Sequence, residues 1–249
     1  MFLQSALEMD AHEAHPALLE TVFAKRVPFW KRVIDVGLSL CALIILSPFL
    51  VFIVVLIKAV SPGPVLFKQQ RVGRGGKLFT CLKFRTMQCD AETTVHKEYL
   101  TQLICGCQSS GNLGAPMKKL ENDCRIIKCG NLLRVTGLDE LPQLFNVLMG
   151  HMSLVGPRPP IPYEVAQYQH WHKARFDVVP GLTGLWQVSG KNKIGFNEMI
   201  RLDISYAKRT SLLLDCWILM LTPYAVLIQL TDYLSKRNML QLSRYTNRR

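Results

Sequence analysis

The chain has 249 residues, of which 49% are hydrophobic and 19% charged, and its formal net charge at pH 7 is +12. The length allows one large domain or two small ones with a sizeable core. The excess of cations favours an anionic partner such as anionic lipid or a phosphorylated substrate. Nucleic acid is not expected, because the cations adjoin apolar segments and no nucleic-acid-binding signature occurs.

Residues 1–27 are predicted to be an N-terminal arm, and we assign no function to its first 24 residues. The segment Lys25-Arg-Val-Pro-Phe-Trp-Lys-Arg32 then places four cations and a tryptophan before an apolar run. This composition is typical of an anchor at the headgroup layer of a membrane.

Residues 28–60 are predicted to be a membrane element, because Val36–Ile57 contains 22 residues without a charge, enough to cross roughly 30 Å of hydrocarbon. Both flanks are basic, which favours the cytoplasmic side for both ends. A proline at Ser47-Pro48 is where the segment would turn within the bilayer, with the serine hydroxyl satisfying a freed carbonyl. We therefore expect a re-entrant helix–break–helix, with a kinked spanning helix as the alternative.

Residues 61–210 are predicted to be a cytoplasmic domain that begins with a β-hairpin. Val65–Val72 and Leu78–Met87 read as strands across a glycine turn at Gly73–Gly76. Lys83 and Arg85 stand two residues apart on one strand, so they point to the same face and form a cationic pair. Residues 88–122 are polar and glycine-containing, which indicates a variable excursion.

Two adjacent carboxylates, Asp139 and Glu140, precede an apolar stripe of helical spacing that starts at Leu141. Pro142 is tolerated only in a first helical turn, so the acids are predicted to lie at a helix N-terminus. Simple complementation of the helix dipole would explain such a pair by itself. A phosphate site is the other interpretation, since Arg134 stands five residues before the pair.

An aspartate can act as a nucleophile towards phosphorus, which makes Asp139 a candidate catalytic residue. Attack on an anionic phosphate needs neutralising charge, and Mg²⁺ held by one or two carboxylates, here Glu140 and Asp139, supplies it together with arginine donors. Gly156-Pro-Arg-Pro-Pro160 fixes Arg158 between rigid prolines, as expected for a guanidinium that binds an oxyanion. Pairing of Arg158 with a structural acid is the alternative.

The remaining segments carry weaker signals. Trp186, in a glycine-punctuated loop, could stack on a base, lie at the lipid interface or pack in the core. His170 and His172 are interpreted as surface residues. Residues 211–249 are predicted to be an apolar interfacial helix with a basic tail, because cations flank Leu212–Leu230 on both sides. The eight cysteines lack paired CxxC units, so free thiols are expected rather than zinc.

Several of these segments, in this order, resemble the bacterial sugar transferase family, the monotopic phosphoglycosyl transferases that start lipid-linked glycan assembly. The resemblance covers roughly residues 28–230, and the chain looks like a minimal catalytic unit of that family. It is carried by the Ser-Pro of the apolar run, Ser61-Pro-Gly-Pro-Val, Lys83-Phe-Arg-Thr-Met, Asn122-Asp followed by Arg125-Ile, Leu138-Asp-Glu-Leu-Pro-Gln-Leu-Phe-Asn-Val, Met152-Ser-Leu-Val-Gly-Pro-Arg-Pro and Pro180-Gly-Leu-Thr-Gly-Leu-Trp-Gln-Val-Ser-Gly.

The resemblance implies an α+β, membrane-associated enzyme of the bacterial inner membrane, with its catalytic domain on the cytoplasmic face. It implies that Asp139 attacks a UDP-sugar, that UMP leaves, and that a polyprenyl phosphate then takes the phosphosugar. It also implies that Glu140 helps hold Mg²⁺ and that the cations Lys83, Arg85, Arg134 and Arg158 surround the phosphates. A homodimer and downstream glycosyltransferases are expected partners. A non-catalytic basic scaffold and a multi-span, non-covalent transferase are the alternatives.

Overall fold

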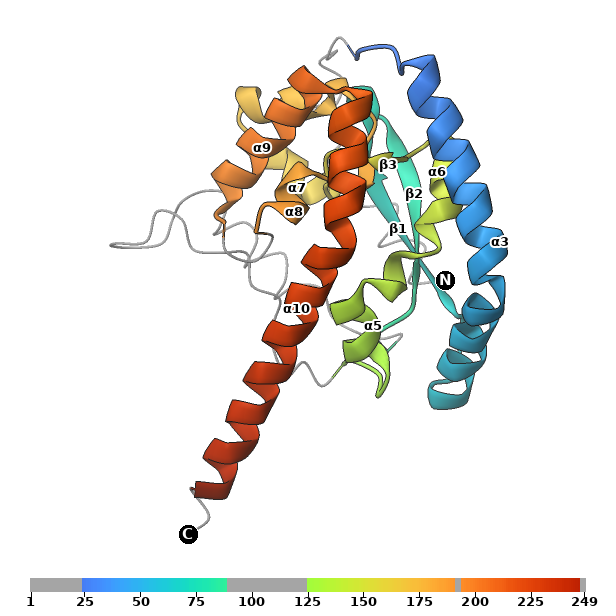
Figure 1. Ribbon diagram of the computed structural model, residues 1–249, viewed down its shortest axis with the longest axis vertical. Coiled ribbons are helices and arrows are strands. Elements are labelled where there is room, and N and C mark those ends of the chain that lie inside the picture. Colours follow the sequence, from blue (N-terminus) through green and yellow to red (C-terminus); the bar gives the residue numbers. More distant parts are fainter. Residues whose placement is uncertain (1–23, 89–124, 191–193, 247–249) are drawn as a thin grey trace.

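The computed structural model describes residues 24–88, 125–190 and 194–246, with side chains up to Ser235 (Figure 1). Most of the predicted arm and residues 89–122 of the predicted excursion lie outside the described residues, and of the basic tail only the helical backbone up to Thr246 is described. The predicted α+β class is confirmed, since helices surround two small two-stranded sheets. The elements are α3 Phe29–Val60, β1 Leu66–Val72, η1 Arg74–Gly76, β2 Leu78–Phe84, α5 Gly130–Thr136, η2 Leu138–Glu140, α6 Gln143–Leu148, β3 Ser153–Val155, α7 Pro162–Ala166, η3 His170–Asp177, β4 Gly181–Thr183, α8 Leu185–Val188, α9 Phe196–Arg209 and α10 Leu212–Thr246.

The predicted hairpin is confirmed. β1 and β2 pair antiparallel from Leu66 opposite Phe84 to Val72 opposite Leu78. The strands are joined by a tight turn in which Gly75 and Gly76 adopt φ angles of 64° and 77°, a region that favours glycine. On β2, Phe79 and Cys81 are buried two residues apart, whereas Lys83 is half-buried and Phe84, on the opposite face, is buried.

The second sheet brings together two motifs that are distant in sequence. β3 pairs parallel to β4, with Ser153 opposite Gly181. A Cβ atom at Gly181 would lie 2.0 Å from the backbone nitrogen of Gly156, so only glycine allows this approach. The segment that carries Arg158 is therefore packed directly on the Pro180–Gly184 segment.

Helix α3 packs along the domain over its whole length. The inner face of its first half buries polar side chains, among them Asp35, while Ile53 and Ile57 in its second half join the core around Phe84 and Leu133. Figure 1 shows α3 curving beside α6 and the hairpin. Its outer face is apolar and exposed, for example at Ile44, Ile45, Val51, Phe52 and Val55.

The predicted break at Ser47-Pro48 is wrong as a break in secondary structure, because Phe29–Val60 is one helix of 32 residues with Pro48 inside it. Pro48 cannot donate to the carbonyl of Ile44 four residues earlier. The Ser47 hydroxyl donates to that carbonyl at 2.8 Å, the role predicted for it, and the helix continues.

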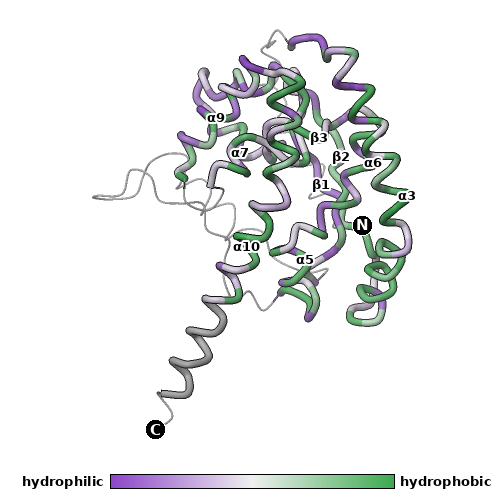
Figure 2. The backbone as a smooth tube through the Cα atoms, in the orientation of Figure 1, coloured by the Kyte–Doolittle hydropathy of each residue, from purple (hydrophilic) through white to green (hydrophobic). Residues whose placement is uncertain are grey.

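Helix α10 docks on the domain with its first turns and is apolar on its outer side. Ile218 is buried in the main core, whereas Leu213 is 83% exposed. Figures 1 and 2 show α5 between α3 and α10, with apolar stretches on all three. Both α3 and the segment Leu212–Ser235 are long and apolar enough to cross a membrane. With exposed Leu132, Phe145 and Met149 of α5, α6 and the turn after α6, they provide the apolar surface of a membrane-associated protein.

A buried lysine joins α3, β3, α9 and α10. Lys31, 4% exposed, donates to the Val155 carbonyl at 3.0 Å, to the Tyr206 hydroxyl at 3.1 Å and to the Asp215 carboxylate at 2.5 Å. Tyr206 also donates to Asp215, at 2.6 Å. The sequence interpretation placed Lys31 among headgroup-facing cations. That placement is wrong, because the fold supplies a buried counterion from 184 residues away.

We expect Asp215→Ala to lower the free energy of unfolding in detergent by about 3–5 kcal/mol, because it leaves the Lys31 charge buried without its carboxylate. Asp232→Ala, an exposed acid on the same helix, is the matched control and should change stability by less than about 0.5 kcal/mol. Similar losses in the two variants would show that the ion pair does not hold the helices.

Candidate active site

The acidic pair lies in a single 3₁₀ turn, η2, between α5 and α6. Gly137 reverses the chain after α5 with a φ of 74°, so the turn places Asp139 inward at 8% exposure and leaves Glu140 half-buried. Pro142 is the residue before the first turn of α6. The prediction of a helix N-terminus is thus nearly right: the acids precede the helix by a short turn of their own.

Glu140 is paired with Lys83 from β2. The Lys83 ammonium lies 3.0 Å from Glu140 Oε1. Asn146, fully buried on α6, fixes this meeting: its side chain accepts from the Leu82 N–H at 3.0 Å and donates to the Thr80 carbonyl at 2.7 Å. The Asn146 amide thus pairs with the open edge of β2 as a further strand would. This pairing brings the Asp139–Glu140 turn to the hairpin.

Arg158 stands in a loop whose backbone carbonyl groups accept hydrogen bonds from other elements. Three of its residues are prolines, which have no N–H to donate, so the loop depends on donors from other elements. Arg71 donates to the Pro159 carbonyl, and the Val72 N–H donates to the Pro160 carbonyl, both at 2.9 Å. Arg175 donates to the carbonyl of Arg158 itself at 2.7 Å. The loop is buried, and the Arg158 side chain is its half-exposed member.

The acidic turn and the Arg158 loop both approach one face of the hairpin. Lys83, which is paired with Glu140, and Arg71, which donates to the Pro159 carbonyl, lie on the same face, because the cross-strand partner of Arg71 is Phe79, four residues before Lys83. Burial raises the pKa of the Cys81 thiol on this strand, while the charges of Lys83, Arg71 and Arg158 lower it and that of Glu140 raises it.

Arg85 and Arg134 differ from Lys83 in their surroundings. Arg85 is buried, and its Nη1 and Nη2 donate at 2.7 Å to the carbonyls of Pro62 and Ser61, so it ties the end of α3 to the hairpin. Arg134 is half-buried in the last turn of α5, directly before the acidic turn. Contact of either residue with a phosphate stays a prediction.

The carboxylates of Asp139 and Glu140 fit the donor set that Mg²⁺ prefers, which is one or two carboxylates completed by water and substrate phosphates. Within residues 24–88, 125–190 and 194–246, no group of three or more histidine, cysteine, aspartate or glutamate side chains could form an all-protein metal cage. A metal here would therefore be shared between this pair and a phosphorylated ligand.

Two residues that shape the site were missed from the sequence, and a buried histidine was assigned to the surface. Asn146 and Arg71 carry no local signal, because an amide in a helix and a cation in a strand usually face water. Trp186 is buried in the core, which decides among its three interpretations. His172 is buried too, so its assignment to the surface is wrong: Tyr168 and Phe196 enclose its ring.

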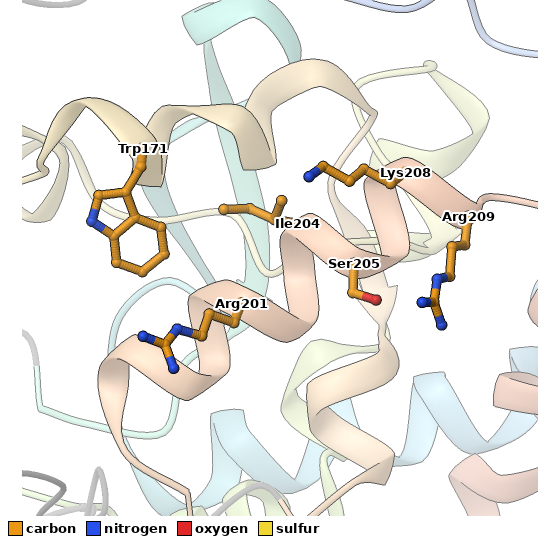
Figure 3. A pocket seen from close by; sticks show the side chains of 6 residues that line it. All are labelled: Trp171, Arg201, Ile204, Ser205, Lys208 and Arg209. Atoms are coloured by element: carbon orange, nitrogen blue, oxygen red, sulfur yellow. The ribbon is translucent and has the colours of Figure 1, made fainter.

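A separate, basic groove of about 500 Å³ lies between η3 and α9. Figure 3 shows Trp171 at one end and Arg209 near the other, with Lys208 reaching over Ile204. Its lining residues are Trp171, Arg201, Ile204, Ser205, Lys208 and Arg209, none of which belongs to the acidic site.

The fold and site define a class of protein: a basic α+β domain associated with a membrane through apolar helices, with two carboxylates among cations suited to phosphate. A model of the family described as "bacterial sugar transferase" matches residues 26–229. The chain belongs to the bacterial sugar transferase family.

Curated relatives agree with this assignment. The chain is 41% identical over 199 residues to galactosyl transferase CpsE of Streptococcus agalactiae, covering 80% of this chain and 42% of the relative. It is 39% identical to the undecaprenyl-phosphate galactose phosphotransferase of Salmonella typhimurium, covering 87% and 44%. Identity to the exopolysaccharide production protein ExoY of Sinorhizobium fredii is 35%, covering 82% and 88%. The chain thus spans less than half of the first two relatives and most of the third.

We expect Asn146→Ala to lower the free energy of unfolding by about 1–3 kcal/mol, because it leaves the partly buried Leu82 N–H and Thr80 carbonyl without their side-chain partner. Gln70→Ala is the matched control: Gln70 also bonds to Thr80, at 3.3 Å, but is exposed, and its loss should cost less than about 0.5 kcal/mol. Denaturant titration compares the two. Equal small losses would mean that Asn146 does not fix α6 to β2.

Proposed function

We propose that the chain is a phosphoglycosyl transferase that moves a sugar-1-phosphate from a UDP-sugar to a polyprenyl phosphate through a phospho-aspartyl intermediate on Asp139. The observation that carries this proposal is that the Asp139–Glu140 turn, paired with Lys83, and the Arg158 loop approach the same face of the hairpin in a member of the bacterial sugar transferase family. Relatives named for galactose transfer to undecaprenyl phosphate or to a lipid carrier support both substrates.

In the first step, an Asp139 carboxylate oxygen attacks the phosphorus that bears the sugar. A bond from oxygen to phosphorus forms, the bridging bond to the uridylyl group breaks, and UMP leaves with the bonding electrons. In the second step, a phosphate oxygen of the polyprenyl phosphate attacks the same phosphorus, which frees Asp139 as a carboxylate. The product is a polyprenyl diphosphate sugar, and no oxidant or external proton donor is needed.

The neighbouring side chains take complementary roles. Lys83 orients Glu140 through their 3.0 Å ion pair and adds positive charge beside the diphosphate. Arg158 offers a planar, two-pronged donor to phosphate oxygens from a loop that does not have to rearrange. Mg²⁺ held by Glu140 and Asp139 would neutralise the charge of the diphosphate.

We expect Asp139→Asn to reduce UMP release from a UDP-sugar at saturating magnesium by at least about a thousandfold, since the amide cannot form the acyl phosphate. The assay offers a panel of UDP-sugars with undecaprenyl phosphate, so it also identifies the sugar. Glu198→Gln, an exposed acid on α9, should retain the parent's activity. Undiminished UMP release by the Asp139 variant would refute the mechanism. No release from any UDP-sugar by the parent would favour the non-catalytic scaffold.

We further propose that α3 enters the cytoplasmic face of the inner membrane and returns to it, so that the domain stays on the cytoplasmic side. A straight helix of 32 residues is about 48 Å long and would separate its ends by more than a bilayer core. Yet Lys31 near its start and Ile57 near its end both contact the same domain. The basic groove, with Lys208 and Arg209 just before α10, suits an anionic lipid surface. A homodimer and downstream glycosyltransferases stay predictions.

We expect cysteines placed at exposed Arg26 and Pro64, on either side of α3, to resist a membrane-impermeant thiol reagent in intact cells with a permeabilised outer membrane. Both should react once the inner membrane is opened, and peptide masses would identify the labelled residues among the native cysteines. Labelling of only one of the two positions in intact cells would show that α3 spans the bilayer.

A further inference from the structure

A second buried ion pair lies directly behind the loop that carries Arg158. Arg175 on η3 is 2% exposed and Asp203 on the inner face of α9 is fully buried, with 2.5 Å between Nη2 and Oδ2. A buried charge pair of this kind costs desolvation energy on both sides, and replacing it with apolar side chains is often neutral or stabilising. Stability alone therefore does not explain why the Arg175–Asp203 pair is present.

The contacts of Arg175 link this ion pair to the Arg158 loop. The same Nη2 group donates to the Arg158 carbonyl at 2.7 Å, and Nη1 donates to the Tyr168 hydroxyl at 2.8 Å. Arg158 and Arg175 also line one small cavity together with Glu164. The Arg175 guanidinium thus holds the carbonyl of Arg158 itself, while Arg71, Val72 and Gly181 hold the carbonyls of the neighbouring prolines, and Asp203 in turn orients the guanidinium.

We propose that Arg175 and Asp203 are positioning residues for Arg158, and that loss of the Asp203 charge loosens the grip of Arg158 on the nucleotide-sugar diphosphate. The inference rests on the proposed function, which assigns Arg158 to those phosphates. Neither residue touches the substrate. Their effect passes through the backbone of the proline-rich loop.

The charges around Asp203 set the pH at which this change occurs. Burial raises the pKa of Asp203 to about 7, although Arg175, and more weakly Arg158, lower it. Tyr168 and Glu164 face the same guanidinium, and burial also raises the pKa of Tyr168, so both the ion pair and the hydroxyl are intact at pH 8. As the pH falls through about 7, the Asp203 carboxyl becomes neutral. Arg175 then lacks its counterion, although its guanidinium still holds the Arg158 carbonyl.

Unfolding would not mimic this effect. The folded-state pKa of Asp203 lies above its ordinary value of 3.8, so the folded state binds the proton more tightly than the unfolded chain. Stability from this group is therefore fully present below about pH 4 and is lost as the pH rises through about 7. A weaker grip on substrate at pH 6 cannot come from destabilisation through Asp203.

The test measures KM and kcat for the UDP-sugar that the parent enzyme turns over, between pH 6 and pH 8. We expect the parent's KM to rise up to about tenfold from pH 8 to pH 6, as one required ionisation near pH 7 predicts. Asp203→Asn should show a KM raised about tenfold already at pH 8 and nearly constant with pH. Glu198→Gln, the same change of carboxylate to amide on the exposed side of α9, should follow the parent.

Arg175→Lys provides the test if Asp203→Asn does not fold. A lysine keeps the charge but cannot reach Asp203, Tyr168 and the Arg158 carbonyl together, so KM should rise at pH 8 while kcat changes less. A parent-like KM profile in a folded Asp203 or Arg175 variant would overturn the inference. A parent that releases UMP from no sugar nucleotide would instead refute the proposed function.

Discussion

The arrangement of the long helices and the second sheet depends on one buried, positively charged side chain. Lys31, near the start of an apolar helix, is enclosed by the domain, and a buried ammonium must find acceptors for its protons. It takes them from β3, α9 and α10, the last through Asp215. These elements cannot move apart independently without exposing an unpaired charge. The two long apolar helices and the second sheet are therefore fixed in one arrangement.

This arrangement reaches the site through short connections. Asp35, one turn after Lys31, accepts from the Ser153 hydroxyl at 3.0 Å and from the Leu154 N–H at 2.9 Å, so α3 holds both ends of β3. β3 leads directly into the proline-rich loop of Arg158, and Arg32 donates to the carbonyls of Val147 and Leu148 at the end of α6. One helix thus fixes the position of both motifs relative to the apolar surface, as the proposed reaction with a lipid-borne phosphate requires.

Local patterns were enough to predict the hairpin, the apolar helices and the acidic turn. The glycine turn of the hairpin, the 22 uncharged residues and Pro142 after the acids are signals that lie among neighbours in sequence. The partners of buried cations could not be predicted, since Lys31 meets Asp215 across 184 residues and Arg71 meets Pro159 across 88. Such contacts leave no periodicity, so Lys31 was interpreted as a headgroup-facing cation. Arg85 was predicted to lie on the strand with Lys83, but β2 ends at Phe84, and the buried contacts of Arg85 with Ser61 and Pro62 depend on where α3 ends.

The contacts of the basic side chains also change the interpretation of the net charge of +12. Backbone carbonyls serve as acceptors for basic side chains throughout the fold, including Lys25 to Ala207, Lys31 to Val155, Arg32 to Val147 and Leu148, Arg71 to Pro159, Arg85 to Ser61 and Pro62, and Arg175 to Arg158. Carbonyls carry only partial charge, so a chain with 30 cations and 18 acids can bury cations without matching each to a carboxylate. Several of these carbonyls belong to prolines or precede them, in segments that lack donors of their own. Part of the basic excess is thus structural.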